Sequence, residues 1–345
     1  MLRAFAVLIL VCACGALGPA RAADAPEAAP GAPPGAHGRS YLIVPPENLS
    51  ENRELYWLGE ALLEGMERYM SWAGAEVATR EERRSIEGDE MGLGPLSVPT
   101  IATRIKEAEE LEVAKLVSGS FATSGETSRL ATVTFSVLDV RQARRSSPAV
   151  VGPLPLDDLP SLQRAVGTKL LQIESLPLPG PDLPTPPASE ADAPAYEARI
   201  KALLEEDPEK RSKYLLRAVE VDPDYFRARL DLAILQREAG EPGKALATLR
   251  AKPFRGDPTL SAQAERIAGE INLEAGDLTP AIEALRRSLS LKDDCSTHLT
   301  LARALIGRGD FQVAAAELEL ARRLDPQDPE IAEVQALLPP PTPPE

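Results

Sequence analysis

The stretch GRGDFQVAAAELELARRLDP, residues 307–326, shows how the second half of this chain folds. Alanine follows Gly309 after five residues and leucine follows it after nine. The same arrangement surrounds Gly240 and Gly276, and a small residue stands seven positions before each of the three glycines. Self-similarity at a period of about 34 residues is typical of helix pairs that stack and bury their apolar faces against one another.

The residue types in this pattern suit helical hairpins. Glycine tolerates the positive φ that ends a helix, and small residues let two helices cross closely. Asp-Pro pairs recur as well, and Asp caps a helix while Pro suits its first position. Pro253 should shorten one helix. The sequence predicts units over 192–225, 226–259, 260–293 and 294–328, followed by a capping helix over 329–338.

The pattern resembles the tetratricopeptide repeat (TPR), a pair of antiparallel helices. The resemblance implies an all-α solenoid whose first helices line a concave groove that binds a peptide or a subunit. The family's groove positions fall on Arg227, Leu230, Ile234, Arg237, Arg266, Glu270, Leu299 and Arg303, with Gln263, Leu273, Glu274, Ser296 and Ile306 beside them. The groove arginines would hold carboxylates through paired hydrogen bonds. The alternative is that they only balance neighbouring glutamates.

The tripeptide Arg308-Gly309-Asp310 matches a cell-adhesion motif of animal matrix proteins. Gly276-Asp277 occupies the same place one unit earlier, without the arginine. Because Gly-Asp recurs with the repeat, we interpret the tripeptide as the turn between two packed helices.

The first half of the chain, residues 40–175, mixes strands and helices. Alternating apolar residues over 130–140 predict a half-buried strand that forms a hairpin with a strand over 113–121. Apolar residues at helical spacing predict helices, and further short strands flank them. The predicted helices cover 53–72, 99–111 and 159–173. We expect a small mixed sheet with two helices on one face, an α+β N-terminal domain that precedes the all-α solenoid.

Two stretches of this half resemble a known family. They are YLIVPPENLSENRELYWLGEALLEGMERYM, residues 41–70, and LEVAKLVSGSFATSGETSRLATVTFSVLDV, residues 111–140. Their order is similar to the N-terminal α/β domain of the periplasmic protein TolB and to related domains of curli-secretion and flagellar outer-membrane lipoproteins. Pro46 stands where that family has an aromatic residue. The resemblance implies the fold and a cell-envelope setting, and it assigns no catalytic residue.

Residues 1–22 are typical of an export signal. Arg3 precedes an apolar run, and residues 20–22 form an A-x-A cleavage site. Alternatively, residues 11–14 resemble a lipobox with Cys14 as the acylated residue, and the Pro/Ala-rich spacer 23–39 would hold the protein off the membrane. We expect a periplasmic protein, anchored at the outer membrane if Cys14 is acylated.

Two more Pro-rich segments follow, the linker 176–191 and the tail 339–345. A linker of this composition predicts two modules that orient separately.

Beyond the signal, the sequence has no run of about 18 apolar residues, so we expect no membrane-spanning helix there.

Composition argues against several functions. The net charge of −15 gives no basic surface for nucleic acid. His37 and His298 have no nucleophile beside them, and Cys295 stands alone, so we expect no catalytic, metal or cofactor site. The sequence predicts a non-enzymatic protein-binding adaptor of a bacterial cell envelope. The alternative is an outer-membrane-tethered lipoprotein subunit or assembly factor of a secretion, pilus or flagellar machine.

Overall fold

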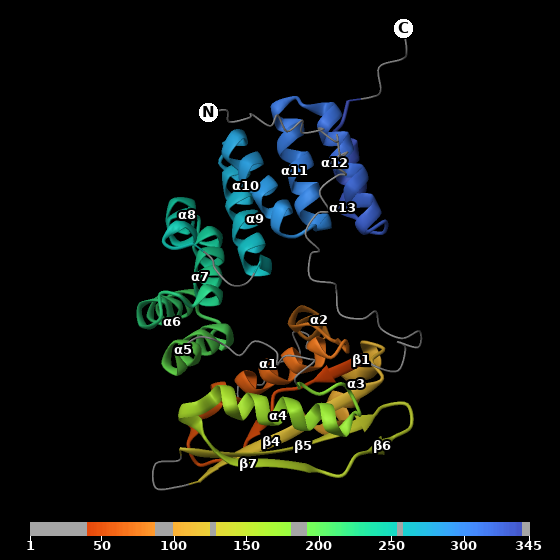
Figure 1. Ribbon diagram of the computed structural model, residues 1–345, viewed down its shortest axis with the longest axis vertical. Coiled ribbons are helices and arrows are strands. Elements are labelled where there is room, and N and C mark those ends of the chain that lie inside the picture. The colour runs from red at the N-terminus through yellow and green to blue at the C-terminus, as the bar shows by residue number, and fades with distance from the viewer. Residues whose placement is uncertain (1–39, 87–98, 125–128, 181–191, 254–257, 340–345) are drawn as a thin grey trace, which may run out of the picture.

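The computed structural model describes residues 40–86, 99–124, 129–180, 192–253 and 258–339. An N-terminal mixed sheet with helices is followed by a row of helical hairpins, which confirms the expected fold class (Figure 1). Among the described helices, none is both long and apolar enough to cross a membrane.

The sheet combines parallel and antiparallel pairs. In the described residues its strands are β1 (Ser40–Ile43), β2 (Glu47–Asn48), β3 (Glu76–Val77), β4 (Lys115–Ser124), β5 (Leu130–Asp139), β6 (Arg144–Arg145) and β7 (Ala149–Pro155). β1 lies parallel to β3 and β4, whereas β5 lies antiparallel to β4, β6 and β7. The sequence pattern did not predict β7, because one glycine and two prolines in seven residues are unusual for a strand. Proline is nevertheless tolerated in a strand at the edge of a sheet.

Two helices cover one face of the sheet, α1 (Tyr56–Trp72) and α4 (Leu159–Ile173). They cross closely at glycines: a Cβ on Gly65 would lie 2.9 Å from the Gln163 side chain, and one on Gly167 would lie 2.4 Å from Tyr69. The expectation that helices cover a single face is wrong. α3 (Ile101–Glu110) packs on the opposite face over Leu42, Val44 and Leu116, and α2 (Arg80–Ile86) was not expected.

The helical hairpins stack in sequence order. They are α5 (Ala193–Leu204) with α6 (Pro208–Val221), α7 (Phe226–Glu238) with α8 (Pro242–Arg250), α9 (Pro258–Glu274) with α10 (Leu278–Leu291), and α11 (Cys295–Arg308) with α12 (Phe311–Leu324), followed by α13 (Glu330–Ala336). At Gly269 a Cβ would lie 2.6 Å from Leu285, so the small residue permits the crossing of α9 and α10. α8 has nine residues and ends before Pro253.

The adhesion-like tripeptide forms the turn between α11 and α12. Gly309 ends α11 with a φ of 89°, which a residue with a side chain rarely adopts. Arg308 Nε donates to Asp310 Oδ2 over 2.5 Å, so the two charged side chains are paired with each other.

The first hairpin packs directly on the α/β region through α1 and α5. Arg199 of α5 is 6% exposed. It donates from Nη1 to Glu64 Oε1 of α1 over 2.8 Å, and from Nε to Asp231 Oδ2 of α7 over 2.7 Å. Tyr196 donates its hydroxyl to Glu64 Oε2 over 2.6 Å, and it accepts from the Gln163 amide of α4 over 3.1 Å.

This junction corrects the prediction that the Pro-rich linker lets two modules orient separately. Tyr196 and Ile200 share one apolar core with α1 and α4. Arg80 of α2 adds a hydrogen bond from Nη2 to the carbonyl oxygen of Leu203 over 2.9 Å. The α/β region and the first hairpin therefore form one packed unit.

The buried charges of the junction perturb one another. Burial raises the pKa of Glu64, but the charge of Arg199 and the hydrogen bonds from Tyr196 and Arg199 more than offset this, so its pKa lies below the ordinary 4.5. Burial, together with the neighbouring Glu64 charge, raises the pKa of Tyr196 well above 10.0. Glu64 is therefore ionised and Tyr196 protonated at neutral pH.

Replacing Arg199 should destabilise the whole chain. Arg199→Met should lower the free energy of unfolding by about 3–5 kcal/mol, because Glu64 stays buried without its cationic partner. Arg217→Met is the matched control, since Arg217 is exposed on α6, and it should change that free energy by about 0.5 kcal/mol at most. Urea denaturation followed by circular dichroism measures both. Equal stabilities of the two variants would contradict the role of Arg199.

The junction should also weaken in acid. A carboxyl with a lowered folded-state pKa stabilises fully above its ordinary value of 4.5, and this contribution is lost as the pH falls through the lowered value. The difference in unfolding free energy between the wild type and Glu64→Gln should therefore be constant above about pH 5 and shrink at lower pH. Denaturation across a pH series measures it. A difference that persists undiminished at the lowest pH would contradict the linkage.

Candidate functional site

The first helices of successive hairpins, α7, α9 and α11, lie in one row that α13 extends (Figure 1). The predicted groove residues fall on this row, which we call the concave surface after that prediction. α7 contacts α9, and α9 contacts α11, so side chains from neighbouring hairpins can meet on it.

Ion pairs between successive hairpins cross this surface. Arg237 of α7 donates from Nη1 to Glu270 Oε2 of α9 over 2.5 Å and from Nε to Glu274 Oε1 over 3.1 Å. Arg303 of α11 reaches α13, with its Nη1 3.0 Å from Glu330 Oε2. Arg266 pairs with Glu270 on its own helix. Three of the predicted groove arginines therefore neutralise neighbouring glutamates in the free chain.

The pairing stabilises the charged form of the Arg237 guanidinium. Hydrogen bonding to Glu274, with added charge attraction from Glu270 and Glu274, outweighs burial and raises the pKa of its guanidinium above the ordinary value of an arginine. A ligand carboxylate would have to displace a glutamate to reach this arginine.

The predicted apolar positions divide into buried and accessible ones. Leu230 and Leu299 are 7% and 0% exposed, so their side chains belong to the cores between hairpins and cannot contact a ligand. Ile234 is half-buried and lines a cavity of about 160 Å³ that also includes Arg84 of α2. Arg227, in the first turn of α7, is exposed. The concave surface at α7 therefore faces the α/β region of the same chain.

A second cavity, of about 140 Å³, opens between α9, α10 and α11. It brings together Gln263, Arg266 and Ser296, which the sequence assigns to two different units. Lys292 joins them, and the sequence interpretation missed it because it lies between helices rather than on a first helix. Amide, hydroxyl and cationic groups converge here, a combination that suits a carboxylate.

Asp294 also lines this cavity, but its carboxylate is occupied. Oδ2 accepts hydrogen bonds from the backbone nitrogen of Thr297 over 3.0 Å and from the hydroxyl of Thr297 over 2.8 Å, and so caps α11. Its negative charge is held at the helix N-terminus, where it is most stable.

The residues considered for catalysis are engaged elsewhere. His298 is buried, with Nδ1 2.6 Å from Glu317 Oε2 and Nε2 2.8 Å from Asp293 Oδ1. Burial and the neighbouring Asp328 raise the pKa of the Cys295 thiol to about 11, so the nucleophilic thiolate is scarce at neutral pH. Within the described ranges, no three His, Cys, Asp or Glu side chains are grouped as metal ligands. Cys14 and His37 lie outside the described residues.

No protein-family model and no curated protein matches the chain. A solved structure of MamA matches with 22% identity over 40% of this chain and 80% of that chain, at a TM-score of 0.36. MamA from Desulfovibrio magneticus matches with 16% identity over 41% and 82%, at a TM-score of 0.37. A TPR protein of Thermus thermophilus matches with 17% identity over 51% and 89%, at a TM-score of 0.35. Likeness at this level says nothing about a partner or an activity.

Proposed function

We propose that this chain is an exported, non-enzymatic adaptor of a bacterial cell envelope, and that its concave helical surface binds a peptide segment or a subunit of a partner protein. One observation carries the proposal: the cavity between α9 and α11, where Arg266 and Lys292 meet polar residues of two successive hairpins. Elsewhere on the concave surface, Arg237 and Arg303 are neutralised by glutamates of the same chain.

An acidic side chain or a C-terminal carboxylate fits this cavity best. Arg266 gives one terminal nitrogen to Glu270. Lys292 is exposed and makes no ion pair with any residue that the structure describes. A ligand carboxylate can therefore gain Lys292 and the rest of the Arg266 guanidinium without displacing Glu270. Charge-assisted hydrogen bonds of this kind are about twice as strong as neutral ones.

The rigid junction defines what kind of adaptor this would be. A flexible linker raises the effective concentration of two binding modules without setting their orientation. Here Arg199 and Tyr196 attach the first hairpin to α1, so two partners bound by the α/β region and by the array would be held at a set angle.

The envelope setting rests on the sequence. The export signal over residues 1–22 and the resemblance of residues 41–70 and 111–140 to TolB-type domains support it.

The absence of an activated nucleophile at Cys295, whose pKa is raised to about 11, agrees with a binding role.

Photo-crosslinking tests the concave surface. A benzoylphenylalanine at Gln263 should capture a discrete partner in envelope extracts, whereas one at Arg250, exposed on the second helix α8, should not. Arg266→Glu with Lys292→Glu should reduce capture about tenfold or more, because like charges then face the ligand carboxylate.

The matched charge reversal, Arg250→Glu with Arg286→Glu on second helices, should leave capture unchanged. Identical capture from both crosslinking positions, or capture that survives reversal of Arg266 and Lys292, would refute binding at this cavity.

A lipid-anchored assembly subunit is the second candidate, favoured by the lipobox-like residues 11–14 and the spacer 23–39. Radiolabelled palmitate should then be incorporated into the wild type and into Cys12→Ser, but not into Cys14→Ser. A wild-type chain that takes up no label is not a lipoprotein.

A further inference from the structure

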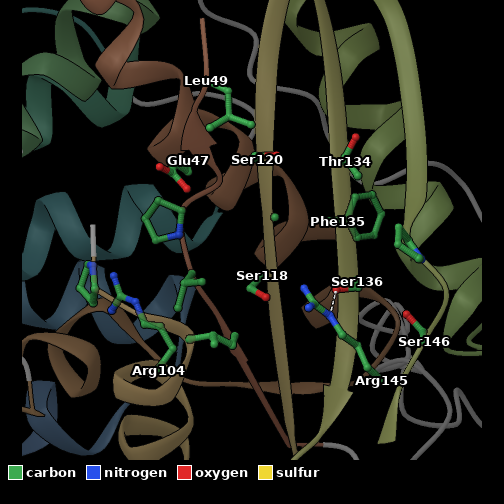
Figure 2. A pocket seen from close by; sticks show the side chains of 16 residues that line it. Glu47, Leu49, Arg104, Ser118, Ser120, Thr134, Phe135, Ser136, Arg145 and Ser146 are labelled. Carbon is green, nitrogen blue, oxygen red and sulfur yellow. Dashed lines mark hydrogen bonds between the residues drawn. The ribbon is translucent and has the colours of Figure 1, made fainter. Parts of the chain in front are cut away.

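The sheet face opposite α1 and α4 is only partly covered. α3 packs on its apolar part, and the next side chains on the same face of β4 and β5 are hydroxyls. Ser118 lies directly opposite Ser136, and Ser120 lies directly opposite Thr134. A cavity of about 430 Å³ opens over these four residues (Figure 2).

Three of these hydroxyls are free to bind a ligand. Ser118, Ser120 and Thr134 are half-buried, and their side chains form no hydrogen bond with another residue in the described part of the chain. Ser136 is different, because its oxygen accepts from Arg145 Nε over 2.6 Å. The sheet face thus offers a row of unused hydroxyl donors and acceptors beside an anchored guanidinium.

Two arginines stand on opposite sides of Ser118 (Figure 2). Arg104 of α3 pairs with Glu107, 2.8 Å away. Arg145 of β6 is exposed and makes no ion pair with a described residue, so its two terminal nitrogens remain available. The bond to Ser136 fixes the direction of the guanidinium, which lowers the entropy lost when a ligand binds.

Further features make this region favourable for an anion. The N-terminal turn of α3, which Thr100 caps, contributes Pro99 and Ile101 to the cavity wall, and a helix N-terminus carries partial positive charge. Arg141 and Arg144 flank the same turn of the chain as Arg145. In a protein with a net charge of −15, this basic group would attract anions locally.

We infer that this cavity binds a small soluble phosphorylated polyol, such as a sugar phosphate. A tetrahedral phosphate accepts hydrogen bonds from several directions at once, and the donors here come from β4, β5 and β6. A planar carboxylate would use Arg145 and leave most of the hydroxyls unpaired. The cavity volume lies within the range of small-molecule sites, about 300–1,000 Å³, and exceeds what phosphate alone would fill.

The opposite end of the cavity suits the polyol. Glu47 of β2 lies beside Ser120, away from Arg145 (Figure 2). A carboxylate accepts hydrogen bonds from sugar hydroxyls, whereas it would repel a second phosphate. Leu49, which lies near Glu47 and is 61% exposed, provides an apolar wall at this end (Figure 2). This site is separate from the concave helical surface, so it goes beyond the adaptor function and does not depend on it.

Isothermal titration calorimetry on the whole chain tests the inference with glucose 6-phosphate, inorganic phosphate, glucose and malate as probes. Glucose 6-phosphate should bind saturably and more tightly than phosphate or malate, and glucose should not bind. Arg145→Gln should weaken glucose 6-phosphate binding about tenfold or more, because it removes a charged donor. Thr134→Val, which keeps the shape and removes the hydroxyl, should weaken it about threefold to tenfold.

Arg141→Gln is the matched control and should change the affinity by about twofold at most, because Arg141 contributes only at long range. Equal unfolding midpoints of the variants and the wild type establish that the variants are folded. If Arg145→Gln does not fold, the effect of Thr134→Val on binding decides the test. The inference is overturned if glucose 6-phosphate does not saturate by about 10 mM, or if phosphate or malate binds as tightly. Undiminished binding by Arg145→Gln overturns it as well.

Discussion

The arrangement of this protein depends on Arg199. A buried guanidinium is costly unless its partners are in place, and here it pairs with Glu64 of α1 and Asp231 of α7 while it sits on α5 itself. The three helices can therefore adopt few relative positions that keep the charges paired. Because each hairpin of a solenoid contacts only its neighbours, the angle set at α5 is passed along to every later hairpin.

The same means of joining helices recurs on the concave surface. Arg237 connects α7 to α9, and Arg303 connects α11 to α13. These ion pairs connect neighbouring helices of the array, but they also neutralise its arginines. In the proposed binding role, the self-neutralised parts of the surface offer little to a ligand, while the cavity beside Arg266 and Lys292 keeps cationic groups that a ligand can reach.

The two faces of the sheet illustrate a different constraint. On one face, Gly65 and Gly167 bring α1 and α4 close enough to seal an apolar core. On the other, α3 covers only the apolar end, and the antiparallel pair of β4 and β5 presents hydroxyls beyond it. An antiparallel sheet tolerates one wet face, so these positions were free to carry binding groups instead of core residues.

The local pattern of residues along the chain was sufficient to predict the repeats and several elements of the α/β region. The glycines at 240, 276 and 309, with small residues seven positions before them, specify helix ends and close crossings, and the structure has positive φ at all three. The alternation of apolar residues over 130–140 predicted β5, and their helical spacing over 159–173 predicted α4. Each of these signals depends on residues that are near one another in the chain.

Tertiary packing, in contrast, determines which polar residues are buried and which predicted groove residues are accessible. Glu64 and Arg199 are separated by 135 residues, and each is indistinguishable in the sequence from a solvated helix residue. Leu299 occupies a groove position but is fully buried, because the packing of α11 turns it inward. Arg266 and Lys292 come from one hairpin, and they share a cavity with Ser296 only because the next hairpin stacks on theirs. Pairing and burial at long range depend on how whole elements pack, and no periodicity along the chain encodes that packing.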